Sequence, residues 1–115
     1  LEVVSMDFKI TDYKRCKVVK GLGRIDSATA PDIEKVLNEL VEERKTIILD
    51  MSDITFVSSA GWWAIIRAYK ELQKGNAGKI VLAGLNENVK SSMDLIGILP
   101  YFPTYDSLVE AVADI

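Results

Sequence analysis

Residues 50–63, which read DMSDITFVSSAGWW, join a compact apolar run to the start of an amphipathic helix. The run that precedes and overlaps them, KTIILDM at residues 45–51, has the length and composition of a strand buried on both faces. After the two serines, apolar residues that include Trp62 recur at helical spacing on one face. The stretch therefore links a buried strand to a helix, the alternation typical of an α/β fold.

The rest of the chain continues this alternation. Strands are expected at residues 2–11 and 16–23, which pair as a hairpin, at 79–85, and as a short edge strand at 102–105. Helices are expected from Thr29 or Ala30 to about Glu43, from the serine pair to Gly75, after Asn86, and after Asp106 or Ser107, the last with Leu108, Val109 and Val112 facing inward. The sequence thus predicts a single α/β domain over residues 1–115, with an N-terminal hairpin, a mixed and mostly parallel sheet of about four or five strands, and about four helices.

Composition limits the kinds of function. The 115 residues are 49% apolar and 27% charged, which is ordinary for a globular domain, and the net charge of −3 leaves no basic excess for DNA or RNA. No apolar run approaches the ~20 residues of a membrane span, and no secretory signal is seen. The chain has no histidine, so we expect no catalytic triad, no metal site and no cofactor. Its single cysteine cannot form an internal disulfide, so we expect a cytoplasmic protein.

Three features have a structural and a chemical interpretation. Cys16 lies at a predicted strand position, where a half-buried structural thiol is expected, although basic neighbours could lower its pKa. The GLG at residues 21–23 is read as a turn, because it lacks the rest of a dinucleotide-binding loop. Asp26 and Asp50 follow strands and could act as an acid–base pair, but both are common turn and cap residues. We favour the structural interpretation for all three features.

The serine pair is the stronger candidate for a site. The N-terminus of a helix carries unpaired N–H groups and a partial positive charge, so a phosphate group is stabilised there. The alternative is that Ser58 only caps the helix and Ser59 follows it. Trp62 and Trp63 point about 100° apart, so one of them leaves the core. If Trp62 is buried, Trp63 either serves as an exposed docking anchor or is partly buried against a loop.

Three segments together resemble the STAS domain family, and within it the bacterial anti-sigma factor antagonists. They are VVKGLGRIDSATAPDIEKVL at residues 18–37, IILDMSDITFVSSAGWWAIIRAYKEL at 47–72 and DLIGILPYFPTYDSLVEAV at 94–112. The central segment is similar to the family's signature, in which an apolar strand leads to D-S-S/A-G and a helix. The resemblance implies a STAS-like fold over nearly the whole chain and a protein that is not an enzyme.

The resemblance also implies a phosphoswitch. In the family, a partner that is both an anti-sigma factor and a serine kinase of the GHKL type phosphorylates one serine, and the modified protein releases that partner. Alignment on the signature places this serine at Ser59, with Ser58, which replaces the family's aspartate, as the alternative acceptor. We expect the partner-binding residues to be Asp26, Ser27, Ser58, Ser59, Ala60, Gly61, Trp63 and Arg67.

Two further hypotheses remain open. The chain could be a constitutive STAS scaffold within a larger complex, without phosphorylation, because Ser58 stands where the family has a carboxylate. It could instead be a small nucleotide-binding α/β protein that holds a ligand phosphate at a helix N-terminus. The leading hypothesis is the phosphorylated anti-sigma factor antagonist, which regulates transcription through a sigma factor.

Overall fold

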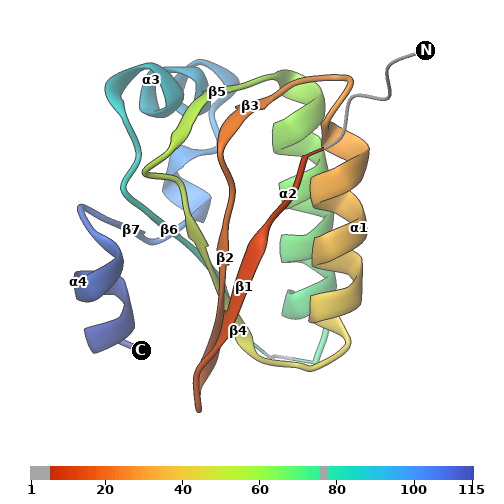
Figure 1. The fold of residues 1–115 in the computed structure, drawn as a ribbon, viewed down its shortest axis with the longest axis vertical. Coiled ribbons are helices and arrows are strands. Elements are labelled where there is room, and N and C mark those ends of the chain that lie inside the picture. The colour runs from red at the N-terminus through yellow and green to blue at the C-terminus, as the bar shows by residue number, and fades with distance from the viewer. Residues whose placement is uncertain (1–5, 76–77) are drawn as a thin grey trace.

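The computed structural model describes residues 6–75 and 78–115, which form an α/β fold with two sheets (Figure 1). The strands are β1 (Lys9–Asp12), β2 (Cys16–Lys20), β3 (Gly23–Ile25), β4 (Thr46–Asp50), β5 (Ile54–Val57), β6 (Ile80–Ala83) and β7 (Thr104–Tyr105). The α-helices are α1 (Ala30–Val41), α2 (Ser59–Gln73), α3 (Glu87–Ile96) and α4 (Leu108–Ala113), and the 3₁₀ turn η1 spans Leu99–Tyr101.

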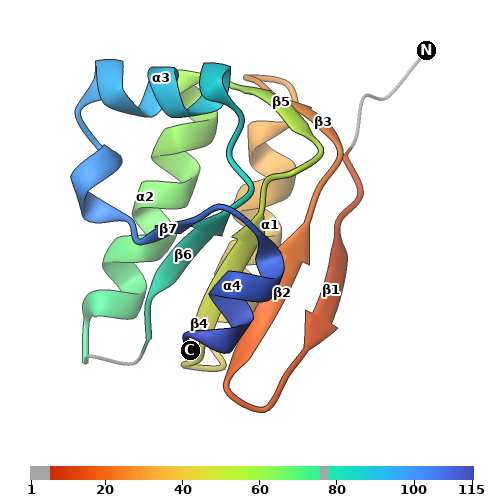
Figure 2. The ribbon, with the colours of Figure 1, turned by 90° about the vertical axis from the view of Figure 1, so that its left-hand side faces the viewer.

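The main sheet has five strands in the order β1-β2-β4-β6-β7. The β1–β2 hairpin is antiparallel, while every other neighbouring pair in this sheet is parallel. Helices α1 and α2 cover one face and α4 lies on the opposite face, as Figure 2 shows. The predicted mixed, mostly parallel sheet with an N-terminal hairpin and four helices is therefore confirmed.

The central strand β4 contributes to the core on both faces of the sheet. Ile47 and Leu49 belong to the larger apolar cluster, which includes the buried faces of α1 and α2. Ile48 belongs to a second cluster with Ala111 of α4. Side chains alternate across a strand, so burial on both faces requires the continuous apolar run that the sequence shows.

The second sheet pairs β3 with β5 in parallel, and the sequence analysis missed both strands. The strand predicted over residues 16–23 ends at Lys20, and the chain passes through Gly21 and Leu22 before β3 begins. A Cβ on Gly21 would come within 2.9 Å of the Phe8 ring, and Gly23 has a positive φ of 102°. These two glycines let the chain leave the main sheet and pair with β5.

Three further differences concern the ends of the elements. Residues 2–5 of the first predicted strand lie outside the described residues, and 6–8 are not in a strand, since β1 begins at Lys9. Helix α1 ends at Val41 rather than near Glu43. In α4 the prediction for Val109 is wrong, because this residue is 78% exposed and Ala111 is the one fully buried. In a helix of six residues, the register of the apolar face is set by few positions.

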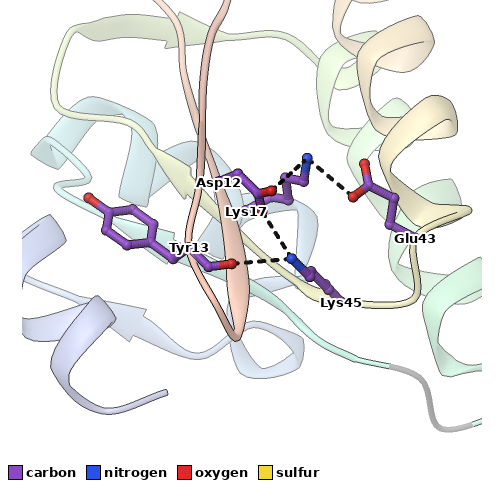
Figure 3. Close-up of polar contacts among 5 residues, drawn as sticks. All are labelled: Asp12, Tyr13, Lys17, Glu43 and Lys45. Carbon is purple, nitrogen blue, oxygen red and sulfur yellow. Dashed lines mark hydrogen bonds and ion pairs between the residues drawn. The ribbon is translucent and has the colours of Figure 1, made fainter.

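The end of the hairpin carries a cluster of charges that ties it to the neighbouring loop (Figure 3). Lys45 Nζ lies 3.0 Å from Asp12 Oδ1 and 3.2 Å from the Tyr13 carbonyl oxygen. Lys17 Nζ lies 3.7 Å from Asp12 Oδ2 and 3.2 Å from Glu43 Oε1. In Figure 1 the turn of the β1–β2 hairpin lies at the bottom of the molecule, whereas the N-termini of α1 and α2 lie at the top. The charged cluster is therefore remote from the serine pair at the start of α2.

Candidate functional site

The serine pair lies where β5 ends and α2 begins, and Ser58 is the N-cap of α2. Its backbone is extended, with φ of −79° and ψ of 171°, and its Oγ accepts a hydrogen bond from the Gly61 N–H at 3.2 Å. The Ser58 N–H donates to the Ile25 carbonyl at 2.7 Å. These bonds attach the start of α2 to the end of β3 and use the Ser58 hydroxyl in the cap.

Ser59 is the first residue of α2, and its side chain is exposed. None of the side-chain hydrogen bonds found among residues 6–75 and 78–115 involves its hydroxyl. The two adjacent serines therefore differ in role: one satisfies the backbone of the helix, and the other presents a hydroxyl to solvent beside the positive end of the helix dipole.

A second turn lies beside the serines, because β3 and β5 are parallel and end together at the paired residues Ile25 and Val57. In this turn one Asp26 carboxylate oxygen accepts hydrogen bonds from the N–H groups of Ala28 at 3.0 Å and Thr29 at 3.2 Å. The bond from Thr29 is the main reason that the pKa of Asp26 is lowered. The fold thus brings Asp26 and the exposed Ser27 next to the serine pair.

Gly61, which the sequence analysis expected at the partner surface, is used in packing inside the fold. It is buried, and a Cβ at this position would lie 2.6 Å from Ile25 Cγ2, 2.9 Å from Val57 Cγ1 and 3.1 Å from the Ile25 carbonyl oxygen. The glycine allows α2 to pack closely on the β3–β5 sheet, which leaves Ser58, Ser59 and the partly exposed Ala60 as the surface of this turn.

The two tryptophans divide as the helical geometry requires. Trp62 is completely buried, and its Nε1–H donates to Ser92 Oγ of α3 at 2.9 Å. Trp63 is 50% exposed and lies beside Tyr101, a neighbour that the sequence did not indicate. Trp63 is therefore partly buried, as one interpretation expects, and its use as a docking anchor stays a prediction.

Arg67 continues the exposed side of α2 and pairs with α1. Its Nε and Nη2 donate to the two carboxylate oxygens of Glu34 at 2.9 and 2.8 Å. This hydrogen-bonded guanidinium lowers the pKa of the Glu34 carboxyl. The sequence analysis missed Glu34 because 33 positions separate the partners and neither residue alone indicates the pairing.

The weaker candidates prove to be structural. Cys16 is buried, and burial raises the pKa of its thiol, contrary to the lowering that its basic neighbours could have produced. The Asp50 carboxylate accepts hydrogen bonds from the N–H and Oγ–H of Ser52 at 3.2 and 2.7 Å. The described part of the chain holds no cluster of three carboxylate or thiol side chains that could bind a metal. In the same part, no helix is both long and apolar enough to cross a membrane.

Comparison with known proteins gives matches along the length of the chain. The family model described as STAS domain matches residues 7–111. BtrV of Bordetella bronchiseptica, which is named as a candidate anti-sigma factor antagonist, is 29% identical over 92 residues, covering 79% of this chain and 78% of BtrV. A related sequence with this name thus aligns with most of the domain.

Solved structures share the architecture. An anti-sigma factor antagonist from Mycobacterium paratuberculosis superposes with a TM-score of 0.85 at 23% identity, covering 96% of this chain and 93% of that chain. The antagonist SpoIIAA in its unphosphorylated form gives 0.76 at 19% identity, with coverages of 94% and 95%. Phosphorylated SpoIIAA from Bacillus gives 0.71 at 19% identity, with coverages of 94% and 98%. These likenesses establish a common fold, and the family match over residues 7–111 shows that the chain belongs to the STAS domain family.

Proposed function

We propose that this chain is an anti-sigma factor antagonist whose partner is an anti-sigma factor with GHKL-type serine kinase activity. In this proposal the unmodified chain binds the partner, and phosphorylation of Ser59 releases it, so that the chain regulates sigma-factor-dependent transcription without being an enzyme itself. The observation that carries the proposal is the division of roles between the serines, with Ser58 in the helix cap and Ser59 exposed on the first turn of α2. The names of the relatives support an anti-sigma factor as the partner.

The switch requires little change of shape. A phosphate on Ser59 would add a charge of about −1.5 to −2 at a helix N-terminus, where the backbone N–H groups and the helix dipole favour an anion. The domain should therefore stay folded. A partner docked over the same turn would have to desolvate that charge beside the Asp26 carboxylate. A penalty of about 3 kcal/mol is enough to weaken binding more than a hundredfold.

The geometry favours Ser59 over Ser58 as the acceptor. Transfer of phosphate needs a hydroxyl that a kinase can reach, and the Ser59 side chain is exposed. The Ser58 oxygen is bonded to the Gly61 N–H, so its modification would disturb the cap, which is worth about 1 kcal/mol. The partner surface in this proposal comprises Asp26, Ser27, Ser58, Ser59, Ala60, Trp63 and Arg67.

The test is labelling by an anti-sigma factor kinase of the GHKL type from the organism that produces this chain. The wild-type chain, Ser59→Ala and Ser58→Ala are each incubated with that kinase and ATP, and phosphate is mapped by mass spectrometry. We expect one phosphate on Ser59 in the wild type and in Ser58→Ala, and none in Ser59→Ala. Binding of the kinase without any label would instead identify a constitutive scaffold. Binding of nucleotide by the chain alone, seen by calorimetry, would favour a nucleotide-binding protein.

A further inference from the structure

A groove of about 290 Å³ lies between α2 and the segment that follows α3. Its floor is apolar, since Ile66, Ile98 and Phe102 are all buried and the Tyr69 and Phe102 rings lie 5.2 Å apart. Its rim carries two open aromatic rings, Trp63 at 50% and Tyr101 at 60% exposure. Exposed tryptophan and tyrosine beside an apolar floor are the residue types that most often dominate the energy of protein interfaces.

One charge faces this groove, and the described residues leave it without an ion pair. Lys70 lines the groove, which has no acidic lining residue. The neighbouring cations of α2 are already paired, Arg67 with Glu34 and Lys74 with Glu71. Apolar surface together with a negative charge near Lys70 Nζ would therefore complement the groove.

The groove and the exposed serine lie on the same side of α2. Ser59 and Trp63 are four residues apart on α2, so they are neighbours on one side of the helix, about 6 Å apart along the axis. Lys70 follows eleven residues after Ser59, about 16 Å along the axis and close to the same angular position. A partner that contacts Ser59 and extends about 16 Å along this side of α2 therefore reaches Lys70 and the groove.

We propose that the groove binds an acidic, apolar segment of the same protein partner, with one large apolar side chain between Trp63 and Tyr101 and a carboxylate at Lys70. This inference rests on the proposed function for the identity of the partner. It adds an anchor that holds the partner through apolar contact, while the turn at Ser59 controls release by charge. Trp63 supplies most of the affinity in this arrangement, and Lys70 fixes the direction of the segment.

The test measures affinity for the kinase used in the labelling experiment, by biolayer interferometry with the full chain. Trp63→Ala and Tyr101→Ala are each expected to weaken binding at least about 30-fold, which corresponds to about 2 kcal/mol. Lys70→Glu should weaken binding about tenfold or more, and exchange of a carboxylate in the partner's docked segment for lysine should restore it. Val109→Ala, which removes an exposed apolar side chain on the far face, should bind within about twofold of the wild type. Circular dichroism of each variant verifies that the domain is folded.

The outcomes separate this inference from the proposed function. If Ser59→Asp abolishes binding while all three groove variants bind like the wild type, the groove inference is wrong and the switch stands. If the kinase neither binds nor labels the chain, the proposed function fails. The groove is then tested by photo-crosslinking: benzoylphenylalanine replaces Trp63 in the organism that produces this chain, and the crosslinked protein is identified by mass spectrometry. The absence of a crosslink to an acidic, apolar segment overturns the inference. Self-association that Trp63→Ala abolishes would place a second copy in the groove and would likewise contradict it.

Discussion

Replacement of each serine by alanine in turn should separate the structural hydroxyl from the free one. Ser58→Ala removes the oxygen that accepts from the Gly61 N–H at 3.2 Å and leaves that donor without its cap. The loss of an N-cap costs about 1 kcal/mol. With an unfolding entropy of about 2.1 cal/mol/K per residue, a chain of 115 residues should lose about 4 °C in Tm.

Ser59→Ala makes the same chemical change one residue later, where the hydroxyl is exposed, and should leave Tm within about 1 °C of the wild type. Ser58→Asp is the matched control, because aspartate also caps helices and its charge favours a helix N-terminus, so Tm should return to the wild-type value or above. Thermal unfolding followed by circular dichroism measures all three variants. Equal losses for the two alanine variants, or a loss confined to Ser59→Ala, would refute the assignment of roles.

Three further predictions concern the surroundings of the site. Gly61→Ala should destabilise the domain by about 1–2 kcal/mol in urea unfolding, since contacts of 2.6–3.1 Å outweigh the gain of about 1 kcal/mol in helix propensity, and a stabilised variant would contradict the packing. Trp62→Phe should lower the free energy of unfolding by about 1 kcal/mol or more, because the indole hydrogen bond is lost, while Trp63→Phe should lower it little. Equal effects of the two substitutions would contradict the burial of Trp62 and the exposure of Trp63. Because the pKa of Glu34 is lowered in the folded state, its carboxylate should add up to about 1 kcal/mol to the free energy of unfolding above pH 4.5, and this stability is lost as pH falls through the lowered pKa. Arg67→Met should remove this pH dependence of stability, and an unchanged pH profile in that variant would contradict the prediction.

The sequence predicted the elements that depend on local patterns. The apolar run that contains Ile48 is long enough to be buried on both faces, so its place at the centre of the sheet could be predicted. The caps at Ser58, Asn86 and Ser107 were also predictable, because each needs only a side-chain oxygen three residues before a free N–H. The start of α2 at the serine pair therefore required no knowledge of the tertiary structure.

The features that were missed depend on contacts between distant parts of the chain. Strands β3 and β5 have three and four residues, too few for a periodic signal, and form only because Ile25 and Val57 come together. The exposure of Val109 depends on how α4 sits on the sheet, and the groove at Trp63 depends on where Tyr101 falls after α3. The sequence could indicate an exposed aromatic, but it could not indicate the groove beside it.

The most direct test of the central claim compares two forms of the same chain, unmodified and phosphorylated on Ser59, for affinity to the anti-sigma factor kinase and for stability. The account predicts that the phosphorylated form binds more than about a hundredfold more weakly, while its circular dichroism spectrum is unchanged and its Tm stays within about 2 °C. Equal affinity of the two forms, or loss of the native fold on phosphorylation, would contradict it.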